Sequence, residues 1–335
     1  MLIVLVAWDI VLTLLHPMAR GPISYMANRA TWRAARWASL HVLGGRGLSH
    51  AGPLAVVTNV LAWVIGMWMG YALVYLPSVE AFSYDPTTPF AQKGAMEALY
   101  VSGAALTTVG FGDVVATGEL LRLFTVAEAA TGFGVLSAAI AFVLALHPLV
   151  TQLRSTGLQL ADSGALAPGG AARLLEQAGP SELALVLRQL TESHENVRRF
   201  PVLYYFESGN RNESLSALVR GSTLLLVALR CGQGRDGGPA SVYAEALEKA
   251  IGRLLEDLQR DFVGGRRRKL GQLPLADDTG QRLREVCSFL SPHDFEPNPE
   301  DAVPDGLDDL VAQAEAVLGA VAVEHGHDAA PILSV

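Results

Sequence analysis

Two long apolar stretches constrain the fold of this chain more than any other feature. Leu54–Leu76 has 23 residues and no charge, and Leu120–Leu146 has only two charged residues, Arg122 and Glu128. A helix needs about 20 apolar residues to cross the hydrocarbon core of a bilayer, so both stretches are predicted membrane spans. Tyr71 and Tyr75, near the end of the first stretch, suit an aromatic belt at the membrane surface.

A third apolar stretch, Leu2–Leu15, is shorter and contains Asp9. A cleaved signal peptide is one interpretation of it, but the basic region and the small-residue cleavage site of such peptides are missing. We therefore expect residues 1–16 to form an N-terminal membrane helix, either a third span or a helix embedded in the membrane.

Composition divides the chain near residue 150. Of its 335 residues 50% are hydrophobic and 17% charged, whereas soluble domains have about 25% charged residues. Residues 1–151 contain seven basic and seven acidic residues, and the other 18 basic and 26 acidic residues follow them. The net charge of −8 argues against nucleic-acid binding. The two cysteines, Cys231 and Cys287, show no pairing pattern, which excludes a disulfide framework and a structural zinc site by count.

Residues 17–53 are predicted to be a basic cytoplasmic or interfacial segment. Arg20–His50 contains five arginines and no acidic residue, and Arg29, Arg33 and Arg36 recur at helical spacing. A voltage-sensor helix would carry arginines through an apolar segment, whereas an amphipathic helix would rest on anionic lipid. The polar flanking residues favour the amphipathic helix, and the basic excess favours the cytoplasmic side.

The segment between the two strong spans has two parts. Pro77–Phe90 contains three prolines and two acidic residues and is predicted to be an exposed extracellular loop. Ala91–Leu106 is moderately apolar but too short to cross the bilayer and return. It is predicted to be a re-entrant half-helix, which a membrane tolerates only where protein or water lines it.

The half-helix leads directly into the heptapeptide Thr-Thr-Val-Gly-Phe-Gly-Asp, residues 107–113. This string resembles the selectivity filter of the potassium channel family, and the resemblance extends over an outer helix, pore helix, filter and inner helix. It implies a single-pore module at 54–150, with the outer helix at 54–76, the pore helix at 91–106, the filter at 107–113 and the inner helix at 120–147. It also implies roles for named residues: K⁺ coordination by Thr108, Val109, Gly110 and Phe111, and filter support by Thr107, Gly112, Asp113 and Tyr100.

Desolvation explains why a filter needs such residues. An ion that enters a narrow pore loses its water, and closely spaced backbone carbonyls must replace that water. Alternate residues need unusual dihedral angles to aim successive carbonyls at one axis, and Gly110 and Gly112 adopt such angles without a Cβ penalty. Val109 and Phe111 would pack behind the filter. The resemblance implies a hydrogen bond from Tyr100 to Asp113, as an aromatic–carboxylate pair forms in several family members, although Tyr100 could instead be a core aromatic residue where helices meet.

One filter sequence cannot surround an ion, so the resemblance implies a homotetramer. The filter of such a channel opens outward, which places the start of Leu54–Leu76 and the C-terminal half in the cytoplasm of a multi-pass cell-membrane protein. Unpaired cysteines fit that reducing compartment.

Two inner-helix residues are gating candidates. Gly132 lies where related channels carry a hinge glycine, although close helix packing would also require a small residue. Glu128 is ionisable within a span, and such residues face protein or water. It could bond to the back of the pore helix, attract cations near the cavity, or be a structural carboxyl.

Residues 151–335 are predicted to be a helical cytoplasmic regulatory domain. Apolar residues recur at three- to four-residue spacing within six segments: Ala171–Gln177, Glu182–Val197, Asn212–Arg230, Val242–Phe262, Gln281–Phe289 and Leu307–Val321. No dinucleotide-binding motif follows a strand, so a nucleotide-binding regulatory domain is not assigned. The cluster Arg266–Lys269 could bind anionic lipid or be a solvated loop, and the acidic stretch Asp294–Asp309 is predicted to be a linker.

The sequence therefore predicts an all-α membrane protein that conducts K⁺ passively through a tetrameric pore in the lipid bilayer, gated by its helical C-terminal domain. A non-selective cation channel is one alternative, although Phe111 rather than an aspartate favours potassium. A non-conducting membrane sensor or interaction protein is another. No nucleophile–base pair or metal cluster predicts an enzyme, and no cofactor is expected. The regulatory ligand is unknown.

Overall fold

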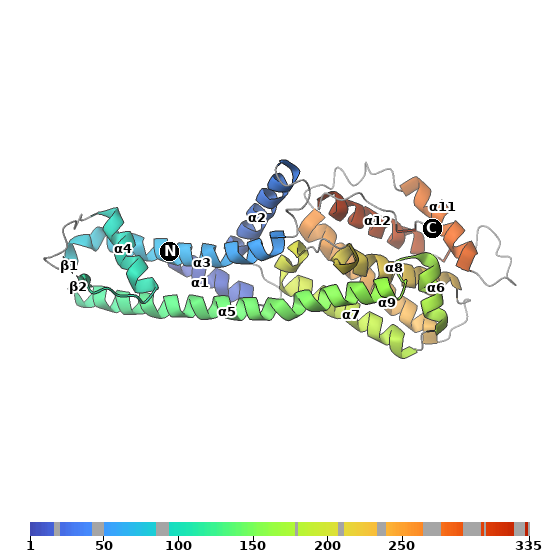
Figure 1. Cartoon of the computed structure of the whole chain (residues 1–335), viewed down its shortest axis with the longest axis horizontal. Helices are drawn as coiled ribbons and strands as arrows, with labels where there is room; N and C mark the ends of the chain where they lie inside the picture. Colours follow the sequence, from blue (N-terminus) through green and yellow to red (C-terminus); the bar gives the residue numbers. More distant parts are fainter. Residues whose placement is uncertain are drawn as a thin grey trace. The chain divides into compact units, whose positions relative to one another are not determined.

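Helices form nearly all the regular structure of the chain (Figure 1). The computed structural model describes residues 1–16, 21–41, 50–84, 94–177, 180–206, 211–232, 239–263, 276–290, 303–304, 306–324 and 332–333. These residues form two compact units. The first contains residues 1–34 and 52–147, and the second contains residues 35–51 and 148–335.

The first unit is built on two long apolar helices. Helix α3 (Ala51–Tyr75) continues into the 3₁₀ helix η2 (Leu76–Ala81), and α5 spans Glu119–Asp162. Both are long and apolar enough to cross a membrane. The apolar helices α1 (Leu2–Leu15) and α4 (Ala95–Leu106) are shorter. This arrangement confirms an all-α membrane protein.

The inner helix is longer than the sequence predicted. The dipeptide His147-Pro148 suggested an end near residue 147, because proline removes a helical hydrogen bond. Helix α5 instead contains Pro148 and continues to Asp162, and its later turns bury Leu153 and Leu160. Burial of an apolar face outweighs the local preference of one proline.

A small sheet replaces part of the expected loop at Pro77–Phe90. Beyond η2, strand β1 (Phe82–Tyr84) pairs antiparallel with β2 (Val114–Ala116), and Tyr84 lies opposite Val114. The rest of that loop and the first three residues of the predicted half-helix lie outside the described residues. Strands of three residues are too short for an alternating pattern to reveal them.

Helix α1 packs against α3 through two glycines. A Cβ atom on Gly66 would lie 2.7 Å from the Val6 side chain, and one on Gly70 would lie 2.7 Å from the Ile3 side chain. Small residues allow helices to approach closely, which is the usual packing mode within membranes. Helix α2 (Pro22–His41) begins beside the same pair, and its first turn contacts Asp9 of α1.

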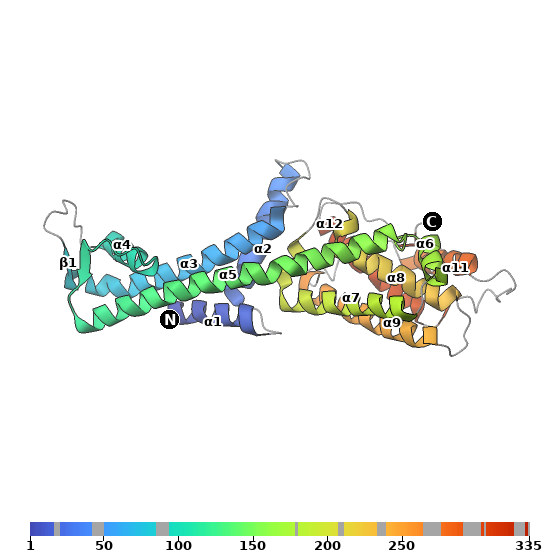
Figure 2. The same cartoon turned by 60° about the horizontal axis from the view of Figure 1, so that its bottom comes forward.

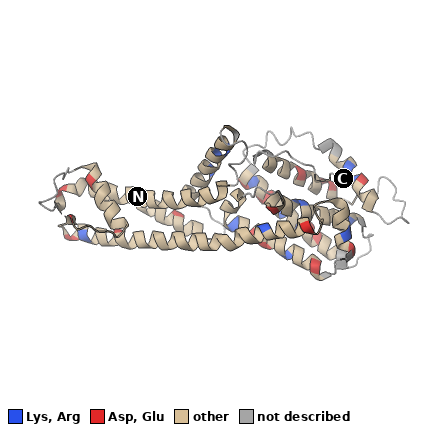
Figure 3. Ribbon diagram, in the orientation of Figure 1, with Lys and Arg blue, Asp and Glu red and all other residues tan. Residues whose placement is uncertain are grey.

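The second unit is a bundle around α8 (Leu215–Gly232), which contacts α6 (Pro168–Gln177), α9 (Pro239–Leu258), α11 (Ala276–Leu290) and α12 (Leu307–Glu324). Helix α7 (Pro180–Arg199) packs against α9. Helix α8 is buried on nearly all sides, as expected for the central helix of a bundle. Charged residues are sparse along the apolar helices α1 and α3 and frequent on the helices of the bundle (Figure 3).

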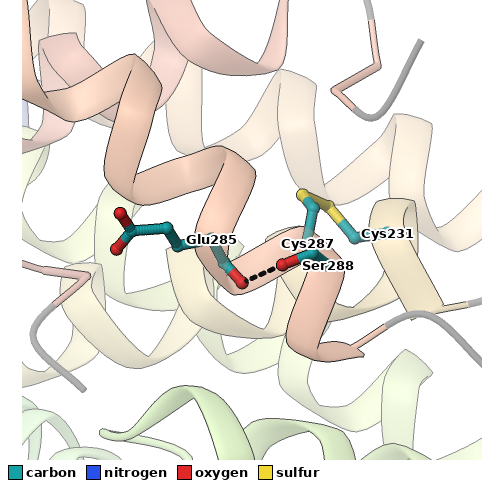
Figure 4. The surroundings of a disulfide bond; sticks show 4 residues. All are labelled: Cys231, Glu285, Cys287 and Ser288. Carbon is teal, nitrogen blue, oxygen red and sulfur yellow. Dashed lines mark hydrogen bonds between the residues drawn. A yellow bond between two sulfur atoms is a disulfide. The ribbon is translucent and has the colours of Figure 1, made fainter. Parts of the chain in front are cut away.

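The expectation from the sequence that the two cysteines are unpaired is wrong. Cys231 at the end of α8 and Cys287 on α11 form a disulfide (Figure 4). Their Cα atoms lie 5.1 Å apart although 56 residues separate them in sequence. Counting cysteines excludes a dense framework but cannot exclude a single pair that the fold brings together.

Arg266–Lys269 and most of Asp294–Asp309 lie outside the described residues.

Candidate functional site

The glycine-bearing heptapeptide lies between the end of α4 and strand β2. Carbonyl groups of the last turn of α4 hold its first residues in place. The N–H groups of Val109 and Gly110 donate to the Ala104 carbonyl, at 3.1 and 3.3 Å, and the N–H of Thr108 donates to Ala105 at 3.0 Å. The Thr107 hydroxyl donates to the Gly103 carbonyl at 2.6 Å. The end of the short helix therefore fixes where the heptapeptide begins.

Every second residue of this segment has a positive φ angle. The values are 58° for Thr108, 53° for Gly110 and 81° for Gly112. Glycine adopts such angles without cost, whereas a β-branched residue such as Thr108 does so only where its surroundings impose them. The strained conformation of Thr108 costs about 1–3 kcal/mol, and strain of this kind concentrates at functional sites.

Glycine is required at positions 110 and 112 by the positive backbone φ angle and not by a lack of room for a side chain. A Cβ atom built on either residue would meet no atom of the chain within 4 Å. A larger residue would therefore fit sterically but would have to adopt a left-handed backbone conformation. The expectation that these two glycines supply unusual angles agrees with this geometry.

The C-terminal end of the segment is held by an aromatic residue of α4. The Tyr100 hydroxyl donates to Asp113 Oδ2 at 2.7 Å, the contact expected from the sequence. The Tyr100 ring also stacks on Phe111, with 6.4 Å between ring centroids and 8° between ring planes. Apart from this ring contact, 70% of Phe111 is exposed in the single chain, as is 55% of Val109, so the single chain does not bury either side chain behind the segment.

Gly132 of the inner helix touches the backbone of α4. A Cβ atom at this position would lie 1.9 Å from the Leu106 carbonyl oxygen. Such a distance leaves no room for a side chain, because the neighbour is backbone rather than a flexible side chain. Of the two roles considered for Gly132, close packing is the one for which the geometry provides a direct reason.

Glu128 lies one turn before Gly132 and is completely buried. Its carboxyl accepts hydrogen bonds from Tyr75 of α3 at 2.6 Å and from Ser102 of α4 at 2.5 Å. The carboxyl therefore bonds to the back of α4, one of the arrangements considered for it from the sequence. It has no exposed surface with which to attract cations.

Sequence reasoning did not identify the partners of Glu128 as functional candidates. Tyr71 and Tyr75 were expected at the membrane surface, but both are buried, and the Thr131 hydroxyl donates to the Tyr71 hydroxyl at 3.2 Å. Ser102, also buried, is a hydroxyl residue in an apolar half-helix. Such polar groups within apolar helices are the signal that could have revealed these contacts, because each needs a partner inside the membrane.

Several groups outside the heptapeptide are paired with one another. His194 of α7 bonds to Asp257 of α9 at 2.8 Å, and within the described part of the chain no group of three or more His, Cys, Asp or Glu side chains could hold a metal ion.

Comparison with known proteins adds independent information. Residues 58–146, from α3 through the heptapeptide into α5, match a protein family described as "Ion channel". An uncharacterized membrane protein, YdjJ, of Bacillus subtilis (strain 168) is 24% identical over 254 residues, which cover 72% of this chain and 71% of YdjJ. No solved structure matches the chain. The family match indicates an ion channel, and both comparisons agree with a membrane protein.

Proposed function

We propose that this chain is the subunit of a homotetrameric, potassium-selective channel. The observation that carries the proposal is the alternation of positive φ angles at Thr108, Gly110 and Gly112, directly after a short apolar helix. Carbonyls of Thr108, Val109, Gly110 and Phe111 coordinate the dehydrated ion, and the C-terminal end of α4 adds a partial negative charge below them.

Four chains around one axis complete the ion site. The exposed faces of Val109 and Phe111, and those of Phe133, Leu136 and Ile140 on the inner helix, support this arrangement, because neighbouring subunits would cover them. The filter opens outward, and the helical second unit lies in the cytoplasm and gates the pore. The basic segment before α3 supports this orientation.

Flux into liposomes tests the proposal. Purified protein is expected to pass K⁺ far better than Na⁺ and to elute with a mass four times the 35.6 kDa of one chain. The variant Gly110→Asp is expected to abolish K⁺ flux, because it places a side chain and a charge on a filter residue. Gly118→Asp is the matched control, since Gly118 precedes α5 and aspartate is favourable at a helix N-cap.

The other outcomes separate the alternatives. Equal K⁺ and Na⁺ flux would identify a non-selective cation channel, and a folded tetramer without flux would identify a membrane sensor or interaction protein. Potassium flux that persists in Gly110→Asp would contradict the assignment of the filter.

A further inference from the structure

Glu128 is a buried carboxyl at which three helices of the first unit meet. It belongs to α5, and its two oxygens accept from different helices: Oε2 from Tyr75 of α3 and Oε1 from Ser102 of α4. The Ser102 hydroxyl also lies 2.9 Å from the Trp68 carbonyl of α3, and the Trp68 indole donates to the Leu99 carbonyl of α4 at 2.7 Å. The short helix is thus tied to α3 and to α5 through the same few groups.

Water cannot replace these contacts. Glu128 and Ser102 are fully buried, and so is Tyr75. A buried polar group that loses its partner keeps its full desolvation penalty, so the three groups favour one arrangement of the three helices.

The contacts also set the register of α5 against α4. Glu128 contacts Ser102, and Gly132, one turn later, contacts the Leu106 carbonyl, which is one turn beyond Ser102. Leu106 ends α4, and the next residues are Thr107 and Thr108. A shift of α5 along its axis would therefore displace the residue from which the filter begins.

We propose that Glu128 is a positioning residue of the filter: it holds α4 in register with α3 and α5, and it transmits displacement of the inner helix to the carbonyls of Thr108 and the residues that follow. This inference rests on the proposed potassium channel function. It assigns to Glu128 a role in ion selectivity without contact between the carboxyl and the ion.

The test removes one hydroxyl at a time from the full-length tetramer. Ser102→Ala and Tyr75→Phe each delete one hydrogen bond to Glu128, Glu128→Ala deletes both, and Glu128→Gln keeps an acceptor oxygen. Ser137→Ala is the matched control, because Ser137 is an exposed residue of α5 whose hydroxyl donates to the Phe133 carbonyl of its own helix. The readouts are the ratio of K⁺ to Na⁺ flux in liposomes and the rise in thermal midpoint when K⁺ replaces Na⁺, since an ion that binds the folded filter stabilises it.

Ser102→Ala and Tyr75→Phe are each expected to lower the flux ratio by at least about fivefold, the factor that corresponds to about 1 kcal/mol for one buried hydrogen bond. Both variants are also expected to reduce the K⁺-dependent rise in thermal midpoint. Glu128→Gln is expected to retain most of both readouts, and Ser137→Ala all of both. If Glu128→Ala does not assemble, the two hydroxyl deletions still decide the question.

A wild-type flux ratio in Ser102→Ala and Tyr75→Phe, with intact tetramers, would overturn the role of Glu128 and leave the channel proposal in place. The absence of any K⁺ preference in the wild-type protein, in both flux and melting, would overturn the channel proposal and this inference together.

Discussion

In the first unit, contacts between helices depend on single residues that are unfavourable within an apolar helix, such as a carboxylate or a glycine. Asp9 is fully buried in an apolar helix, a costly position for a carboxylate. The backbone N–H groups of Ile23 and Ser24 in the first turn of α2 and the indole N–H of Trp63 surround it with donors. Because a helix N-terminus also carries partial positive charge, Asp9 stabilises the start of α2 and ties it to α1 and α3.

Gly132 allows a prediction at the same scale. Gly132→Ala places a methyl group 1.9 Å from the Leu106 carbonyl oxygen, whereas a Cβ atom at Gly134 meets no atom of the chain within 4 Å. We expect Gly132→Ala to destabilise the protein by about 1–3 kcal/mol through overpacking. Gly134→Ala should be neutral or stabilising by up to about 1 kcal/mol through helix propensity. Thermal midpoints of the two variants in detergent measure the difference.

The same comparison distinguishes packing from flexibility. If Gly132 served only as a hinge, Gly132→Ala would be as stable as Gly134→Ala and would differ only in how often the channel opens. Equal midpoints for the two variants would therefore contradict the packing role.

At the scale of elements, the sequence predicted most helices and missed the contacts between segments distant in the chain. The predicted segment Leu54–Leu76 corresponds to α3, and Leu307–Val321 corresponds to α12, because apolar periodicity and composition act locally. The continuation of α5 past Pro148 could not be predicted, since it depends on burial of residues such as Leu153. The β1–β2 pair and the partners of Glu128 depend likewise on the tertiary fold.

For the candidate site, too, the sequence predicted local features and missed those that depend on the tertiary fold. Filter residues and the Tyr100–Asp113 contact could be proposed from seven consecutive letters and a family resemblance. The left-handed conformation of Thr108 could not, because threonine has no intrinsic preference for it. The contact between Ser102 of α4 and Glu128 of α5 depends on the tertiary fold. Figures 1 and 2 show α4 at the end of the first unit where α5 begins.

One contact between helices of the second unit predicts a pH dependence. Burial raises the pKa of Asp257 on α9, but the hydrogen bond to His194 of α7 and the charges of Arg260 and Arg198 outweigh burial, so the net effect lowers the pKa of Asp257. Because the pKa of Asp257 is lower in the folded protein, the ionised carboxyl stabilises the fold at pH values above about 3.9, the pKa of aspartate in the unfolded chain. This stabilisation is lost as the pH falls through the pKa of Asp257 in the folded protein.

Asp257→Asn is therefore expected to destabilise the second unit by about 1–3 kcal/mol at neutral pH. The difference in thermal midpoint between wild type and variant should remain constant down to about pH 4 and shrink below it. Glu245→Gln is the control, since Glu245 is exposed and pairs with Lys249 of its own helix on the surface of α9. A difference that grows on acidification would contradict this assignment.

At the scale of the whole molecule, the proposed orientation and the disulfide imply different redox environments for the second unit. The orientation proposed for the filter would place the second unit in the cytoplasm, where thiols are kept reduced. Cys231 and Cys287 are nonetheless close enough to pair, and closing a loop of this length stabilises a fold by typically about 2–4 kcal/mol. The proposed orientation and the disulfide agree with each other if the pair is a dithiol in growing cells and a disulfide in purified, air-exposed protein.

Trapping thiols in living cells tests this expectation. Cells that express the chain are quenched with acid, and the denatured protein is alkylated with a maleimide reagent that adds a measurable mass to each free thiol. We expect two labels in the quenched sample and none after purification without reductant, and a purified Cys231→Ser variant should keep one label. A disulfide already present in acid-quenched cells would place the second unit in an oxidising compartment. Because α5 joins the two units, the membrane orientation proposed for the filter would then have to be reversed.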